Sequence, residues 1–297
     1  MSWQAKILGS ITKLTLKRQM GKSGDVVTER ANLEKMTKLT ARQPKGESAE
    51  IGGVPGEWLT PPGADDKRVI LYLHGGGYVM GSLDSHRDMV YRIAEAASAK
   101  TFMADYRLGP EDPFPAAVED GAAAFRGLVA SGVPADKIVI GGDSAGGGLT
   151  IATMLKLRAD GDPMPAAGVC LSPWTDLSLS SPSMVTKAKA DVMLTPAALG
   201  FMAENYLKGQ DAKAPLASPV YANCAGLPPM LVQVGGEEVL LDDATRFADK
   251  AKADGVDITL EEWPGMMHVW HLMAQFLPEG KRAIGTIGEY VRARTGG

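Results

Sequence analysis

Short apolar runs alternate along most of the chain with longer segments in which apolar residues recur every three or four positions. The runs are continuous in Val, Ile and Leu, which is typical of parallel strands that are covered on both faces. The predicted strands span residues 68–77, 100–106, 137–144, 166–173, 229–238 and 258–265, and the predicted helices lie near 86–98, 114–130, 147–160, 242–254 and 279–294. This alternation predicts an α/β fold with a mostly parallel central sheet, flanked by helices and joined by right-handed crossovers.

The start of the chain precedes this alternation and has a different pattern. Trp3, Ile7, Ile11 and Leu14 recur at helical spacing and predict an amphipathic helix. This helix could pack on the body of the protein, cover a lipophilic substrate, or do both.

A second segment, residues 174–228, interrupts the alternation and contains no sheet strand that the pattern reveals. Within it, residues 194–209 predict a helix that begins at Thr195 and Pro196, because proline is favoured in the first helical turn. Ligands of open α/β sheets bind beyond the carboxyl ends of the strands. We therefore expect this insertion to lie over the ligand site, beside the N-terminal helix.

Composition narrows the class of protein. The length of 297 residues fits one large α/β domain with a small addition, and a net charge of −4 argues against a nucleic-acid-binding protein. No apolar run approaches the roughly 18 residues of a membrane span, and Lys13 interrupts the apolar stretch that a secretory signal needs. Cys170 and Cys224 are the only cysteines, so we expect no disulfide framework, no thiolate metal cluster and a cytoplasmic location.

Ser144 lies in a glycine-rich stretch where a predicted strand is followed by a predicted helix. The sequence Gly142-Asp143-Ser144-Ala145-Gly146 fits G-x-S-x-G, in which the serine lies on a sharp strand-to-helix turn and its hydroxyl projects above the sheet edge. A glycine-rich turn of this kind could instead hold a phosphate. However, neither G-x-G-x-x-G nor G-x-x-x-x-G-K-[ST] fits through residues 141–150, which favours a serine nucleophile.

A serine nucleophile needs a base, and the chain has four histidines. The order serine, acid, histidine of this type of site excludes His74 and His86. His268 follows the predicted strand 258–265 directly, whereas His271 lies one helical turn later. The position at the strand's carboxyl end favours His268.

The acid should follow the strand that begins at residue 229, where the candidates are Glu237, Glu238, Asp242 and Asp243. Carboxylates are favoured at a helix N-terminus, so Asp242 and Asp243 suit the start of the next helix. The two glutamates remain, and spacing does not choose between them.

Hydrolysis also needs N–H donors for the oxyanion of the tetrahedral intermediate. The stretch His74–Gly77 follows the first strong strand, and its glycines can present backbone N–H groups. The amide of Ala145, directly after the serine, supplies another donor.

Five blocks resemble, in their order, those of the hormone-sensitive-lipase-like family of α/β-hydrolase esterases, the bacterial family IV carboxylesterases. They read HGGGYVMGS, DYRLGPEDPFPAAVED, GDSAGGGL, VGGEEVLLDDA and PGMMHVW. The resemblance extends from about residue 54 to the C-terminus and implies an α/β-hydrolase fold with a helical cap. The implied domains are N-terminal cap helices over residues 1–45, a catalytic domain over 46–180 and 216–297, and a cap insertion over 181–215.

The resemblance also implies roles for individual residues. The implied nucleophile is Ser144, the implied base is His268, and the implied oxyanion donors are the amides of Gly75, Gly76 and Ala145. The family's D-x-L-x-D pattern reads Glu238-Val239-Leu240-Leu241-Asp242 here, so Glu238 stands where the family has aspartate, with Glu237 as the alternative. In the YRLGPE block, structural roles are implied for Asp105, Arg107 and Glu111. The resemblance implies a possible homodimer and neither a metal nor a cofactor.

These residues predict a serine carboxylesterase that hydrolyses short- to medium-chain acyl esters through an acyl-enzyme. The same machinery could act on an amide, an N-formyl group or an acetylated sugar or antibiotic. A third possibility is a non-catalytic binding module like the plant gibberellin receptors, which resemble this fold but lack the catalytic histidine. The presence of His268 argues against that possibility.

Overall fold

The computed structural model describes residues 2–15, 17, 24–40 and 44–296, with no side chains described for residues 36–40. Its centre is an eight-stranded sheet in the order β1-β2-β4-β3-β5-β6-β7-β8. The strands are β1 (Glu47–Ile51), β2 (Val54–Leu59), β3 (Asp65–Leu73), β4 (Ala99–Ala104), β5 (Ile138–Asp143), β6 (Ala167–Leu171), β7 (Met230–Gly235) and β8 (Ile258–Trp263). The six predicted strands correspond to β3–β8, all paired in parallel, so the predicted fold class is confirmed.

The hairpin β1–β2 was not predicted. It pairs antiparallel with Ile51 opposite Val54, and β2 continues antiparallel onto β4. Gly52 and Gly53 form its two-residue loop, both with positive φ (62° and 79°). A Gly-Gly pair between two β-prone runs is a hairpin signal, because two-residue hairpin turns favour residues that adopt positive φ.

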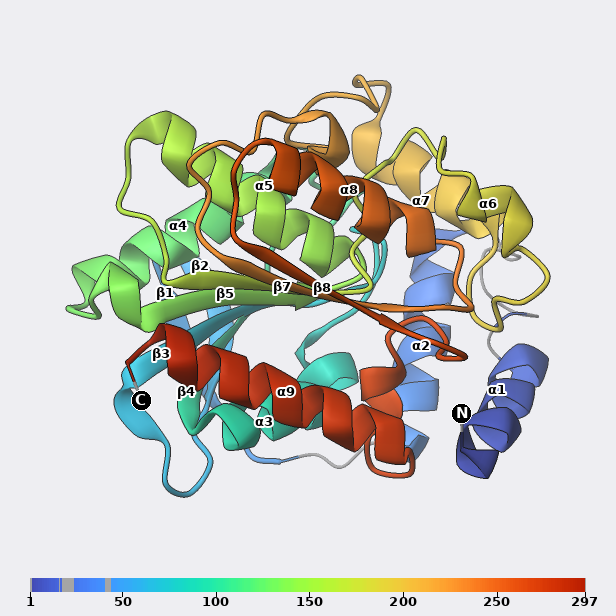
Figure 1. Ribbon diagram of the computed structural model, residues 1–297, viewed down its shortest axis with the longest axis horizontal. Helices are drawn as coiled ribbons and strands as arrows, with labels where there is room; N and C mark the ends of the chain where they lie inside the picture. Colours follow the sequence, from blue (N-terminus) through green and yellow to red (C-terminus); the bar gives the residue numbers. More distant parts are fainter. Residues whose placement is uncertain (1, 16, 18–23, 41–43, 297) are drawn as a thin grey trace.

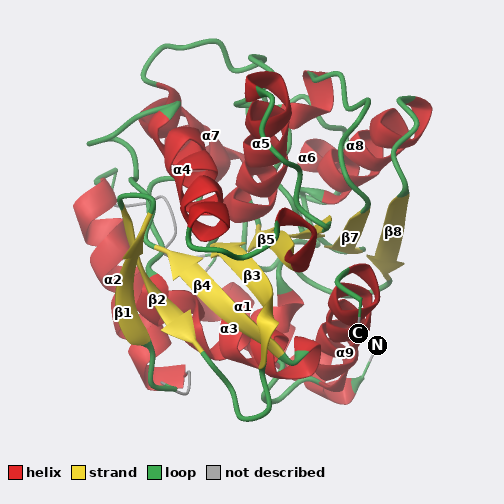
Figure 2. Ribbon diagram, turned by 90° about the vertical axis from the view of Figure 1, so that its left-hand side faces the viewer, coloured by secondary structure: helices red, strands yellow, loops and turns green. Residues whose placement is uncertain are grey.

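Helices cover both faces of the sheet (Figure 1). The large helices are α3 (Leu83–Ala97), α4 (Ala116–Ala130), α5 (Ala145–Asp160), α8 (Leu241–Ala253) and α9 (Pro278–Arg294), and three single 3-10 turns are η1 (Ala135–Lys137), η2 (Pro219–Tyr221) and η3 (Trp270–Met273). Figure 1 shows α3 and α9 on one face and α4, α5 and α8 on the other, and Figure 2 shows the same two layers from the side.

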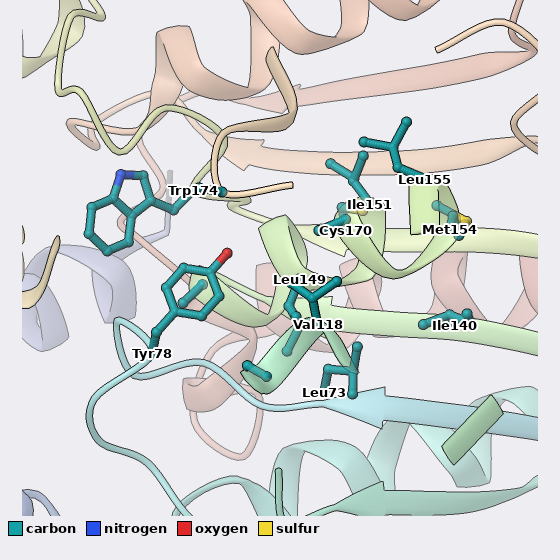
Figure 3. Packing of buried hydrophobic residues seen from close by; sticks show 14 of the residues in the cluster. Leu73, Tyr78, Val118, Ile140, Leu149, Ile151, Met154, Leu155, Cys170 and Trp174 are labelled. Atoms are coloured by element: carbon teal, nitrogen blue, oxygen red, sulfur yellow. The ribbon is translucent and has the colours of Figure 1, made fainter. Parts of the chain in front are cut away.

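Side-chain alternation along β3 explains the two layers. Leu71 and Leu73 belong to the hydrophobic cluster under α4 and α5, while Ile70 and Tyr72 belong to the cluster under α3 and α9. Figure 3 shows part of the first cluster, in which Leu73 of β3 points toward Leu149 of α5. Strands buried on both faces account for the continuous apolar runs in the sequence.

Two further helices, α6 (Ser183–Thr186) and α7 (Pro196–Leu207), lie in the segment between β6 and β7. The helix predicted over 194–209 is therefore confirmed, and its predicted start is correct. The Thr195 hydroxyl accepts the N–H of Ala198, and Pro196 occupies the first helical turn. In Figure 1, α6 and α7 lie near α2 (Val26–Thr40), at the side toward which the parallel strands point.

The predicted amphipathic helix forms as α1 (Trp3–Thr15). Its Ala5 packs in a cluster with Met266, Met267 and Trp270, and the Ser2 hydroxyl and N–H both donate to the Glu279 carboxylate. Its apolar positions, which we call the α1 stripe, face outward instead of packing on the body: exposure is 68 % for Trp3, 50 % for Ile7, 52 % for Ile11 and 58 % for Leu14. The helix itself was predicted correctly, but its apolar side neither packs on the protein nor covers a pocket in the described structure.

Within the described ranges, no helix combines the length and the hydropathy that crossing a bilayer requires.

Candidate active site

Ser144 occupies the turn between β5 and α5 with φ 53° and ψ −120°. A positive φ is uncommon for a residue with a side chain, and such strain persists only where the surroundings enforce it. The neighbouring glycines show what enforces it. A Cβ on Gly146 would lie 1.9 Å from the Leu73 carbonyl oxygen, and one on Gly142 would lie 2.3 Å from the Gly146 carbonyl oxygen. The turn can therefore close only with glycine at both positions.

His268 connects Ser144 to a carboxylate. Its Nε2 lies 3.0 Å from the Ser144 Oγ, and its Nδ1 lies 2.5 Å from Glu238 Oε2. All three side chains are buried. Burial alone would lower the pKa of His268, but the adjacent Glu238 carboxylate outweighs it, and the net shift of this pKa is upward from 6.5.

Glu238 is fixed by donors on its other oxygen. Its Oε1 accepts the Gly235 N–H and the Ser172 hydroxyl, each at 2.7 Å, and the Ser172 Oγ accepts the N–H of Val269 at 3.1 Å. Ser172 thus links the loop that carries the acid to the residue after His268. We did not predict Ser172 from the sequence. Its position directly after β6, at the edge of the sheet where the site is expected, could have indicated it.

The two glutamates that the sequence left open lie in different surroundings. Glu238 is fully buried against His268, whereas the Glu237 side chain is 46 % exposed and lies 3.8 Å from the Lys187 Nζ. The structure brings only Glu238 to the imidazole.

The remaining histidines have other partners. His271 is buried with Nε2 2.8 Å from Gln233 Oε1, and burial lowers its pKa to about 3. His74 stacks on Tyr106 at 4.5 Å between ring centroids, and burial lowers its pKa to about 4. Both rings are therefore neutral parts of the framework.

Gly75 does not match its predicted place among the oxyanion donors. Its N–H donates to Asp143 Oδ1 at 3.1 Å, and a Cβ on it would lie 2.2 Å from Asp143 Oδ2. Gly76 and Gly77, with φ of 122° and 64°, line the cavity beside Ser144. Gly77 was not predicted as a donor, because the sequence does not show which amide of a glycine triplet is already occupied.

Asp143 is the centre of a buried polar network. Besides the Gly75 N–H, its Oδ1 accepts the Tyr72 hydroxyl at 3.0 Å, and its Oδ2 lies 3.2 Å from His86 Nε2. Burial would raise the pKa of Asp143, but the facing His86 holds it below the usual value. Burial likewise would lower the pKa of His86, and Asp143 raises it instead. His86 and Asp143 thus favour each other's charged form beside the glycine loop, residues 74–77.

A cavity opens above Ser144 and His268, and its walls are mostly apolar. Its apolar side chains are Leu33, Met80, Met193, Leu194, Leu199, Met202, Val269 and Leu272. One wall comes from α2, another from α7 and the loop before it, and the floor comes from the loops that carry Ser144 and His268. Such a lining suits the apolar part of a small ligand.

The family model described as the alpha/beta hydrolase fold matches residues 70–272. The chain belongs to the α/β-hydrolase family. Over 253 residues it is 47 % identical to an acetyl-hydrolase of Streptomyces hygroscopicus, covering 85 % of this chain and 84 % of that protein. A crystal structure of an esterase from the bacterial hormone-sensitive lipase family is 46 % identical, covers 100 % of this chain and 99 % of that one, and has a TM-score of 0.94. A structure of EstE5 soaked with p-nitrophenyl butyrate is 43 % identical over 100 % of both chains, also with a TM-score of 0.94. The resemblance stated from the five blocks is confirmed.

In this α/β-hydrolase, Asp191 ties the segment between β6 and β7 to the acid loop. Its Oδ1 accepts the N–H groups of Met193 and Leu194, and its Oδ2 accepts the N–H of Val239 at 2.9 Å. Val239 directly follows Glu238, so one buried carboxylate joins two cavity-lining residues to the neighbour of Glu238.

The YRLGPE block contacts the framework of the hydrolase. Arg107 forms an ion pair with Asp120, and Glu111 forms one with Arg30 of α2. Asp105, Arg107 and Glu111 are absent from the lining of the cavity above Ser144, in agreement with the structural roles expected for them. No cluster of three or more His, Cys, Asp or Glu side chains in the described ranges is arranged to hold a metal ion.

Proposed function

We propose that Ser144 is the nucleophile, His268 the general base and Glu238 the orienting acid of a serine carboxylesterase. One observation carries this assignment: the continuous chain of contacts from Ser144 Oγ through the His268 ring to Glu238. This is the geometry by which an imidazole takes a serine proton while a carboxylate holds the ring and stabilises its charged form. The protein is accordingly a carboxylic-ester hydrolase, in agreement with its relatives.

The reaction proceeds in two halves. Ser144 Oγ attacks the ester carbonyl carbon as its proton passes to His268 Nε2, and the tetrahedral intermediate collapses as that proton moves to the leaving alcohol. Water then attacks the acyl-enzyme, with His268 as base again, and releases the carboxylic acid and free Ser144. Glu238 faces the imidazolium that forms in each half and stabilises it.

The oxyanion donors that we propose are the amides of Gly76, Gly77 and Ala145. Gly76 and Gly77 line the cavity at Ser144, and Ala145 is the first residue of α5, where helix N–H groups lack intrahelical partners. Gly75 contributes indirectly, because its bond to Asp143 fixes the start of the loop.

We infer that residues 1–45 and 181–215 form a cap and that the substrates are short- to medium-chain acyl esters. Leu33 from the first segment and Leu199 and Met202 from the second contribute apolar side chains to the cavity, which supports both parts of this inference. Crystals of the related protein EstE5 were soaked with p-nitrophenyl butyrate, an ester of this class. The cavity has few polar groups with which to select an amide over an ester.

A panel of p-nitrophenyl esters from acetate to laurate, beside an aryl amide, tests this function. We expect turnover to fall as the acyl chain outgrows the apolar cavity and the amide to be the poorer substrate. A fluorophosphonate should label the parent protein and leave Ser144→Ala unlabelled. Full activity in Ser144→Ala would refute the assignment, and faster amide turnover would favour the amidase alternative.

The cellular location and the oligomeric state of the protein stay predictions. A cytoplasmic location is supported by the two cysteines, which are free and buried. A homodimer is supported by the family resemblance alone, and sedimentation velocity would test it.

A further inference from the structure

The α1 stripe is an unusual concentration of exposed apolar side chains. In the described part of the chain, seven large apolar side chains are exposed, and four of them are Trp3, Ile7, Ile11 and Leu14. Isolated exposed apolar residues are ordinary, but a contiguous row along one helix marks an interaction surface. The opposite side of α1 holds the helix in place, because Ala5 and Thr12 are buried.

The N-terminal end of α1 is held on the protein. The α1 stripe is therefore exposed although the helix is attached. The Ser2 N–H and hydroxyl donate to Glu279, the second residue of α9, at 2.6 and 2.9 Å. Phe276, three residues before Glu279, is 53 % exposed. Phe276 therefore adds an exposed apolar side chain close in sequence to the Ser2–Glu279 contact.

The basic residues around the α1 stripe favour a negatively charged partner. Residues 1–24 contain five Lys or Arg and neither Asp nor Glu, although the whole chain has a net charge of −4. Lys6 and Lys13 are exposed and each directly precedes a stripe residue, which places both about 100° from the stripe on the same flank of the helix. An apolar row with a basic flank and an aromatic residue at one end is the arrangement of helices that lie in the interface of an anionic membrane.

We propose that α1 docks the protein on an anionic lipid surface, with the α1 stripe among the acyl chains and Lys6 and Lys13 at the phosphate groups. A second copy of the chain is a poorer partner. Two α1 helices packed stripe to stripe would bring basic flanks together, and one helix about 20 Å long offers much less than the ~800 Å² per partner of a stable interface. The association is peripheral and reversible and does not depend on the proposed hydrolysis.

Flotation with vesicles tests this proposal on the full chain. Vesicles of phosphatidylcholine and phosphatidylglycerol (3:1) should carry the parent protein, and pure phosphatidylcholine vesicles should carry at least tenfold less. Ile7→Gln/Ile11→Gln should lose at least tenfold in partitioning. Val185→Gln is the matched control, because Val185 is an apolar residue of α6 with 82 % exposure, and it should bind like the parent.

The charge is tested separately. Lys6→Gln/Lys13→Gln should weaken binding to the anionic vesicles severalfold, and 0.5 M NaCl should remove most of the difference between this variant and the parent. Circular dichroism and melting temperature report whether each variant is folded, and the salt titration of the parent protein tests the charge contribution without any variant.

Three results would overturn the proposal. The first is no flotation of the parent protein with anionic vesicles. The second is equal flotation of the parent and Ile7→Gln/Ile11→Gln. The third is a parent dimer that Ile7→Gln/Ile11→Gln converts to monomer, since the stripe would then be an interface between copies. Loss of esterase activity in any variant bears on the proposed function and not on this surface.

Discussion

The N–H of Gly75 donates to the carboxylate of Asp143, the residue directly before Ser144. This contact joins the glycine loop to the turn that carries Ser144, so one buried side chain positions both parts of the site. His86 and Tyr72 hold the same carboxylate from its other sides.

Asp143→Asn should therefore lower kcat about 10- to 100-fold and leave KM almost unchanged, since removing an oxyanion donor outright costs about 10²–10³. The amide loses the charge that faces His86 and loosens the loop without deleting a donor. Steady-state kinetics with p-nitrophenyl butyrate measure both constants. Asp162→Asn removes a carboxylate paired with Arg126 instead and should behave like the parent. Equal effects of both variants would contradict a positioning role for Asp143.

Glu238→Gln should reduce kcat by about 10³–10⁴, because the neutral amide no longer favours the correct tautomer or stabilises the imidazolium. Glu237→Gln is a matched control at the adjacent position, and it should retain parental kcat because its carboxylate faces Lys187. Kinetics of the two purified variants decide between the residues. A large loss in Glu237→Gln with little loss in Glu238→Gln would reverse the assignment.

The pH dependence of kcat/KM should follow His268. Only the neutral ring accepts the serine proton, and the raised pKa keeps the ring protonated to higher pH. The rate should therefore rise with pH, with a midpoint above 6.5. In Glu238→Gln the main cause of the upward shift is gone, so the midpoint of its residual activity should move to lower pH. A parental midpoint below 6.5 would be inconsistent with the buried carboxylate–imidazole contact.

Gly146→Ala should prevent the turn from closing, because its Cβ would lie 1.9 Å from a backbone oxygen. We expect a loss of soluble protein or a destabilisation of about 3 kcal/mol, at the upper end of the range usual for forced overpacking. Gly285 lies within α9, and a Cβ on it would meet nothing within 4 Å outside the backbone of its own helix, so Gly285→Ala should stabilise the fold by about 0.5–1 kcal/mol. Urea denaturation of both variants gives the comparison. A parental midpoint for Gly146→Ala would contradict the crowding argument.

Much of this site could be predicted because short sequence motifs indicate its residues. The G-x-S-x-G turn forces glycine at fixed offsets from Ser144, and chain order excludes two of the four histidines. The choice between Glu237 and Glu238 could not be made from the sequence, because both lie in one loop and only three-dimensional contacts with Ser172 and Gly235 separate them.

The errors have an equally physical cause. Gly75 has the same side chain as its neighbours, and only the position of the Asp143 carboxylate shows that its N–H is occupied. The pattern of α1 predicts a helix with an apolar side but does not show which side faces the protein. Here Ala5, Leu8 and Thr12 pack inward, and the four residues of the α1 stripe face solvent.

Arg30 attaches α2, one wall of the cavity, to the loops that contain Val79 and Gly109. Its guanidinium donates to the carbonyl oxygens of Val79 and Gly109 and to the Glu111 carboxylate, and one helical turn later Leu33 reaches the cavity. None of these bonds involves the side chains of Ser144, His268 or Glu238. Variants of α2 that keep Arg30 should therefore change which acyl chain the protein prefers and leave Ser144, His268 and Glu238 in place.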